Sequence, residues 1–223
     1  MCALNQTCRH SHAPTETVIK CQKHIIFYLL STPDVGLVIG DGPSSTLESL
    51  ILEHRLSANY ELKMSEKPLY YFVVLDGNLN VDRSISGIIH MFGGIGIVAL
   101  AFRQHNQART VHDSELYTAS SGTAQALPIR NVLQSLGVHQ ANPTPVFSDS
   151  RSTILCAHDA NALKKSLYLT RHVIFMHDAR DDGETDYYSC EGKTNPSDPF
   201  TKFIEYGPWR AAMHFIMAHP HFA

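Results

Sequence analysis

Four carboxylates stand at positions where a chain of strands and helices could bring acidic side chains together: Asp76, Glu115, Asp149 and Asp198. The first closes the apolar run LYYFVVLD (69–76) and the third closes TPVFSD (144–149), and both runs are typical of buried strands. The other two stand near the starts of helical segments. Strand ends and helix starts can meet at one edge of a sheet, so the spacing indicates one acidic site.

Several carboxylates at one place repel one another unless a cation neutralises them. Oxygen ligands of this kind suit Mg²⁺ or Mn²⁺ rather than zinc. Two such ions, about 3.5–4 Å apart, can activate a water and stabilise the leaving oxygen when a phosphodiester is cleaved. We therefore predict a site for two divalent ions, Mg²⁺ or Mn²⁺, held by all four acids.

Each acid alone also has an ordinary structural interpretation. Asp76 could be a strand-ending turn residue, and Glu115 could be a first-turn acid that interacts favourably with the helix dipole. Asp149 and Asp198 could be helix caps. Their joint placement in the element order is what favours a site.

Three strands are predicted in succession, over residues 69–76, 84–92 and 95–102. Gly93-Gly94 between the last two is a hairpin signal, so antiparallel pairing is expected. A long helix should follow, capped at Asp113 or Ser114 and ended by Gly137. Pro128 lies inside this helix and is expected to kink it or split it in two.

Further elements follow this helix along the chain: a strand over 144–149, a helix over about 161–179, a strand over 186–190 and helical structure over 196–218. The order is β-β-β-α-β-α-β-α, which predicts an α/β fold with a mixed five-stranded sheet flanked by helices. This is a ribonuclease-H-like arrangement. In it the first and fourth strands are neighbours, so Asp76 and Asp149 should lie side by side.

Residues 1–67 differ from the rest and are expected to form a separate segment. Helical spacing runs over 15–30 and stops at Pro33, and VGLVIGDG (35–42) resembles a short strand. LESLILEHRL (47–56) is a possible helix in an otherwise polar stretch. We therefore divide the chain into a leading segment and linker (1–67), a ribonuclease-H-like domain (68–205) and a C-terminal helix and tail (206–223).

Composition limits the partners and the compartment. The 223 residues carry a net charge of −3, so there is no global cationic field for nucleic acid, and a local basic face at Lys164, Lys165 and Arg171 is the best candidate. No apolar run is long enough to span a bilayer, and the N-terminus resembles no secretory signal. Five scattered cysteines fit a reducing compartment, so we expect an intracellular protein, cytoplasmic or nuclear.

Five segments together resemble a known family: HAPTETVIKCQKHIIFYLLSTPDVGLVI (12–39), VVLDGNLNVDRSISG (73–87), HDSELYTASSGTAQALPIRNVLQSLGV (112–138), TPVFSDSRSTILCA (144–157) and NPSDPFTK (195–202). The last four resemble, in order and interval, the motifs of the ribonuclease H domain in copia-type retrotransposon polyproteins. The first is similar to the stretch that leaves the reverse transcriptase in those polyproteins. The polymerase motif Tyr-x-Asp-Asp is absent.

The resemblance implies an endoribonuclease that acts on RNA–DNA hybrids, with Asp76, Glu115, Asp149 and Asp198 as its metal-binding acids. Residues 1–67 would be a remnant of the reverse transcriptase tail, and the rest of a retroelement polyprotein would be a further partner. The chain departs from the family pattern where D-A-D-W is replaced by Asp76-Gly77-Asn78-Leu79, and at Pro128. These departures leave an alternative open, a catalytically decayed fragment that keeps the fold as a non-enzymatic interaction module.

Overall fold

The computed structural model describes residues 13–35, 61–62, 71–138, 140–159 and 167–218. Its strands are β1 (Glu61–Leu62), β2 (Phe72–Asn78), β3 (Ile85–Phe92), β4 (Ile95–Arg103), β5 (Thr144–Ser148) and β6 (Thr185–Cys190). Its helices are α2 (Glu16–Ser31), α4 (Val111–Ser135), α5 (Arg151–His158), α6 (Thr170–Asp181), α7 (Asp198–Thr201) and α8 (Tyr206–Met217), with short 3₁₀ turns η2 (Leu167–Leu169) and η3 (Gly192–Thr194).

The strands form one sheet in the order β1-β6-β5-β2-β3-β4. Strands β2, β3 and β4 pair antiparallel in succession, whereas β5 pairs parallel with β2 and β6 parallel with β5. The predicted ribonuclease-H-like class, a mixed five-stranded sheet with helices on its faces, is confirmed over β2–β6. The two-residue β1 adds a sixth strand beside β6, which the sequence did not predict.

The predicted hairpin is confirmed, and its turn has a clear physical cause. Gly93 and Gly94 both have positive φ, 59° and 80°, which a two-residue turn between right-twisted strands requires and which only glycine adopts readily. The predicted end of the first strand at Asp76 was wrong: β2 runs two residues further, to Asn78, because Asp76, Gly77 and Asn78 all pair with β3.

Helix α4 begins earlier than predicted. The cap is Thr110, whose hydroxyl accepts from the backbone N–H of Asp113, while the Asp113 carboxylate accepts from the Thr110 N–H. The predicted cap at Asp113 or Ser114 was therefore wrong. Asp113 is the third residue of the helix, and its side chain completes the capping box with Thr110. Pro128 does not split the helix. Ala126, before the proline, and Leu133, after it, both pack in the core cluster against the sheet. Gly137, at φ 82°, follows the helix end as predicted.

Two predicted helices differ from those observed. The helix expected over 161–179 begins only at Thr170, as α6, and a separate helix, α5, precedes it. The helical structure expected over 196–218 is broken into α7 and α8, because Lys202 has extended backbone angles. Asp198 therefore opens a four-residue helix that ends well before the C-terminal one.

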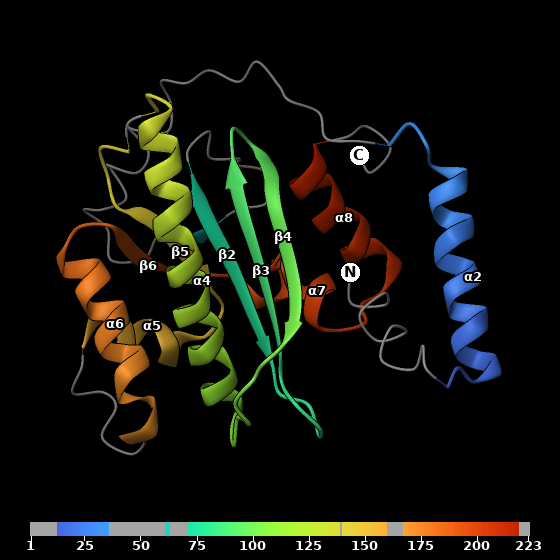
Figure 1. Cartoon of the computed structure of the whole chain (residues 1–223), viewed down its shortest axis with the longest axis horizontal. Coiled ribbons are helices and arrows are strands. Elements are labelled where there is room, and N and C mark those ends of the chain that lie inside the picture. The colour runs from blue at the N-terminus through green and yellow to red at the C-terminus, as the bar shows by residue number, and fades with distance from the viewer. Residues whose placement is uncertain (1–12, 36–60, 63–70, 139, 160–166, 219–223) are drawn as a thin grey trace.

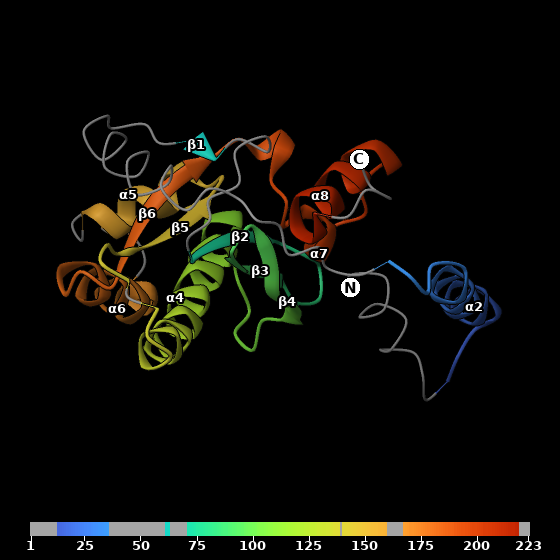
Figure 2. The ribbon, with the colours of Figure 1, turned by 90° about the horizontal axis from the view of Figure 1, so that it is seen from above.

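Helices cover both faces of the sheet, with α4, α5 and α6 on one face and α7 and α8 on the other (Figures 1 and 2). Alternate residues of β2 supply the two cores, as the two-residue period of a strand requires. Val73 and Leu75 pack in the cluster that includes α4, whereas Phe72 and Val74 pack in the cluster that includes α7 and α8. Burial on both faces explains why β2 is apolar without alternation.

The leading segment is described only in part. Helix α2 matches the helical spacing predicted over 15–30, is capped by Thr15 and buries none of its residues. It lies beyond α8, where the ring of Tyr28 is 6.1 Å from that of Trp209 (Figure 2). The strand and helix predicted over 35–42 and 47–56 lie outside the described residues, apart from Val35. In the described part of the chain, no helix is long and apolar enough to cross a membrane.

Strand β2 and helix α4 come into backbone contact at Gly77. A Cβ at this position would lie 2.7 Å from the Ser114 carbonyl oxygen and 2.8 Å from the Glu115 Cα, and neither backbone atom can rotate away. We expect Gly77→Ala to lower the free energy of unfolding by about 1–3 kcal/mol, the usual cost of overpacking. Urea denaturation measures this change.

Gly207→Ala is the matched control, because a Cβ there meets nothing within 4 Å and the residue lies in helix α8. Alanine should leave stability unchanged or raise it slightly. Equal unfolding midpoints for Gly77→Ala and the wild type would contradict the close contact between β2 and α4.

Candidate active site

Asp76 lies on the α7 face of the sheet. It follows Val74 in the alternation of β2, and its side chain is almost fully buried. The Thr201 hydroxyl donates a hydrogen bond to its Oδ2, and the Lys202 ammonium lies 3.4 Å from its Oδ1. The end of α7 and the residue after it therefore hold the Asp76 carboxylate on this face of the sheet.

Glu115 reaches the same place from the opposite face. It is in the second turn of α4, is 7% exposed, and accepts a hydrogen bond from the Gly77 N–H at 3.1 Å. The missing side chain at Gly77 lets the helix come close enough for this contact. The Glu115 carboxylate thus links the end of β2 to the start of α4.

Asp149 is brought in by the register of the parallel strands. Leu75 pairs with Ser148 in the β2–β5 ladder, so Asp149, the first residue after β5, follows in register beside Asp76 of β2. The Oδ1 atom of Asp149 is buried and has no hydrogen-bond partner. A bare buried carboxylate oxygen is costly unless something outside the polypeptide neutralises it.

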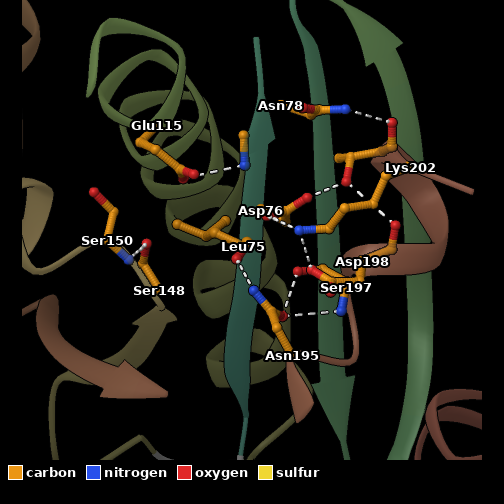
Figure 3. A network of polar contacts seen from close by, with 12 residues as sticks. Leu75, Asp76, Asn78, Glu115, Ser148, Ser150, Asn195, Ser197, Asp198 and Lys202 are labelled. Atoms are coloured by element: carbon orange, nitrogen blue, oxygen red, sulfur yellow. Dashed lines mark hydrogen bonds and ion pairs between the residues drawn. The ribbon is translucent and has the colours of Figure 1, made fainter. Parts of the chain in front are cut away.

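Three of the four predicted acids come together. Asp76, Glu115 and Asp149 each offer an oxygen, and these oxygens lie within 4.8 Å of one another. Asp198 is not part of that group. Its carboxylate pairs with Lys202 at 2.8 Å, and the same ammonium contacts Asp76 (Figure 3). The expected convergence of all four acids is therefore observed for three, with the fourth linked to them through a lysine.

The electrostatics of the site show a surplus of negative charge. Burial, followed by the charges of Asp76 and Asp149, raises the pKa of Glu115 to about 9. Burial and the charge of Asp76 also raise the pKa of Asp149. Burial raises the pKa of Asp198 to about 6, although its hydrogen bond to Lys202 acts in the opposite direction. Burial and neighbouring negative charge therefore disfavour the ionised forms of Glu115 and Asp149.

These features fit a hard divalent cation. Three carboxylate oxygens within 4.8 Å of one another, on residues that include Asp149 with its unpartnered Oδ1, form the type of donor set that Mg²⁺ and Mn²⁺ take. Among the described residues this is the one group of three or more acidic, histidine or cysteine ligands close enough to hold an ion. Asp76, Glu115 and Asp149 would hold it.

The sequence reasoning missed the groups that fix the acids in place. Asn195, which precedes α7, donates to the Leu75 carbonyl at 2.9 Å and accepts from both the backbone N–H and the hydroxyl of Ser197 (Figure 3). Lys202 was also missed as a partner of the acids. Helical spacing from Asp198 does not explain this contact, because Lys202 follows the end of α7 in extended backbone.

Of the three residues predicted to contact nucleic acid, the structure describes Arg171. Lys164 and Lys165 lie outside the described residues, and Arg171 is exposed in the first turn of α6. The structure adds Arg151, which is exposed at the first position of α5, two residues after Asp149. An exposed arginine so close in sequence to one of the acids is a candidate for a phosphate contact.

Comparisons with known proteins show a similarity of fold alone. No protein-family model and no curated protein matches the chain. Among solved structures it is similar to the N-terminal RNase H domain of rv2228c from Mycobacterium tuberculosis, solved as a fusion with maltose-binding protein. The TM-score is 0.46 and the identity 12%, over 60% of this chain and 91% of that one. The fold class itself rests on the strand order and directions described above.

The raised pKa of Glu115 gives the metal-free protein a defined pH dependence. Between its ordinary 4.5 and about 9, the folded state keeps a proton that the unfolded chain has lost. The stabilisation is therefore complete below about pH 4.5 and is lost as the pH rises towards 9. We expect the melting temperature in EDTA to fall steadily from pH 6.5 to 9.

Glu115→Gln should show a flatter decline, because an amide does not titrate. Glu191→Gln, which changes an exposed acid near the site, is the matched control and should follow the wild type. Circular dichroism melts in the same buffers measure all three proteins. The same slope in Glu115→Gln and the wild type would show that Glu115 is not the group that titrates.

Proposed function

We propose that this chain is an RNA–DNA hybrid endoribonuclease of a copia-type retroelement that uses divalent metal ions, Mg²⁺ or Mn²⁺. The observation that carries the proposal is the group of buried Asp76, buried Glu115 and half-buried Asp149, whose oxygens lie within 4.8 Å of one another. A fold can serve many functions, so the site and not the sheet is the argument.

The chemistry follows from the charge of the site. Asp76, Glu115 and Asp149 would hold a divalent ion, which would supply activation of a water at neutral pH and neutralisation of charge on the scissile phosphate. The protein's own part is to hold the acids rigidly. Strand β2 fixes Asp76, the Gly77 N–H orients Glu115, and the partnerless Oδ1 of Asp149 is left available for a ligand.

Asp198 is the fourth acid of the proposed site. With Asp76 it would hold the second of two ions, and both carboxylates already share the Lys202 ammonium. Substrate choice would come from the shape of the hybrid and from contacts to 2′-hydroxyl groups, because A-form duplexes are recognised by shape more than by sequence. Arg151 and Arg171, with Lys164 and Lys165, would contact the phosphates.

The retroelement context rests on the sequence segments that resemble the family. Under this proposal residues 1–67 are the end of a reverse transcriptase, the rest of the polyprotein is a partner, and the protein acts inside the cell. Intracellular action also agrees with the free cysteines Cys21, Cys156 and Cys190.

Cleavage of a labelled RNA–DNA hybrid at low salt, with Mg²⁺ or Mn²⁺, tests the activity. Asp149→Asn should lower the rate at least about a hundredfold, because metal-assisted hydrolysis derives several kcal/mol from its ligands. Asp178→Asn, an exposed acid on α6, is the matched control and should cleave like the wild type. Single-stranded RNA and duplex DNA of the same sequence should be poor substrates.

Hybrid binding, measured by fluorescence anisotropy, should be little changed in Asp149→Asn, because phosphate and sugar contacts supply most of the affinity. Joint substitution of Lys164, Lys165 and Arg171 by alanine should weaken binding and reduce the slope of log affinity against log salt by about 2–3. If the wild type and Asp149→Asn are equally inert at low salt with Mn²⁺, the enzyme proposal is wrong. The decayed interaction module would then take its place.

A further inference from the structure

Lys202 lies between two of the four acids, and its contacts suggest a role that the proposed function leaves out. We propose that its ammonium is a built-in competitor of one divalent ion: it occupies the place between Asp76 and Asp198, so an ion on that side binds only by displacing it. This inference rests on the proposed function and deepens it. It concerns how many ions the resting site holds and how tightly.

The geometry places a single positive charge on two carboxylates. The Lys202 Nζ lies 2.8 Å from the Asp198 Oδ1 and 3.4 Å from the Asp76 Oδ1, and Figure 3 shows both contacts converging on the ammonium. Asp76 and Asp198 are mostly buried, with side chains 3% and 15% exposed. A cation between two such acids is strongly held, because water screens the attraction poorly there.

The backbone beneath the lysine is fixed, whereas its side chain reaches solvent. The Lys202 N–H donates to the Asp198 carbonyl at 3.0 Å, and Asn78 donates to the Thr201 carbonyl at 3.2 Å. The Lys202 side chain itself is 37% exposed. A long flexible stem can therefore carry the ammonium into solvent without unfolding α7.

The two halves of the site differ in what neutralises them. On the Asp198 side the Lys202 ammonium forms an ion pair at 2.8 Å, whereas Asp149 forms no ion pair with the described residues and its Oδ1 is buried without a hydrogen-bond partner. One ion should therefore enter readily beside Asp149 and Glu115. The other must compete with an ammonium that is attached to the chain and is always present at high local concentration.

Mn²⁺ binding to the full chain, followed by the electron paramagnetic resonance of free Mn²⁺, tests the competition. The wild type should bind one ion tightly and a second weakly. Lys202→Met keeps the length of the stem without the charge, and its weak step should tighten by about tenfold or more, since a poorly screened charge pair is worth at least that factor. Lys202→Arg should keep the weak step.

Lys193→Met is the matched control, because it removes the same charge from an exposed lysine on η3, near the site. Its two steps should equal those of the wild type. An unchanged weak step in Lys202→Met, with both ions still bound, would overturn the competition and leave the proposed function standing. Absence of any Mn²⁺ binding in the wild type and in Lys202→Met would overturn both.

A measurement on the wild type alone guards against a variant that fails to fold. Displacement by Mn²⁺ should free the Lys202 amine, so its labelling by an amine-reactive ester, measured by mass spectrometry, should rise severalfold at Mn²⁺ concentrations that fill the weak step. Lys193 labelling in the same sample should stay constant. Lys202 labelling that is equal with and without Mn²⁺, while two ions bind, would show that the ions do not displace it.

Discussion

Repulsion among buried carboxylates is the constraint on which the rest of this structure depends. Asp76, Glu115 and Asp149 place oxygens within 4.8 Å of one another, in surroundings that screen charge poorly. Without an external cation the protein reduces the charge by protonation, and the pKa of Glu115, raised to about 9 by burial and by its two acidic neighbours, expresses that response. A chain selected for stability alone would not keep such a group.

The fold is built to withstand this repulsion by fixing each acid through a different element. The two-residue period of β2 turns Asp76 towards α7, while Gly77 lets α4 approach from the other face with Glu115. Register with the parallel strand β5 places Asp149 beside them. Separate supports matter, because acids on one flexible loop could simply move apart, whereas acids on packed strands and helices cannot.

Much of this arrangement could be predicted from sequence because it follows from strand order. A buried strand that reaches an aspartate, followed later by a second one, places both acids at the same sheet edge if the strands are parallel neighbours, and this held for Asp76 and Asp149. The pairing of Lys202 with Asp198 could not be predicted in the same way. It depends on where the short helix α7 ends and on how the extended Lys202 turns back towards β2. Likewise, the true cap of α4 at Thr110 depends on a reciprocal pair of hydrogen bonds, which a search for any capping residue does not identify.

Asp76 is the residue that makes the two halves of the site interdependent. It belongs to the group with Glu115 and Asp149 and also to the pair held by Lys202. Any charge that sits on the Asp198 side therefore changes the field felt on the Asp149 side, and thermodynamic linkage makes the effect reciprocal. A lysine on Asp76 weakens the hold of the whole site on the first cation, and a cation bound beside Asp149 weakens the hold on the lysine. A cation bound beside Asp149 would therefore weaken the hold of Asp76 on Lys202, and the place between Asp76 and Asp198 would become easier for a second cation to occupy.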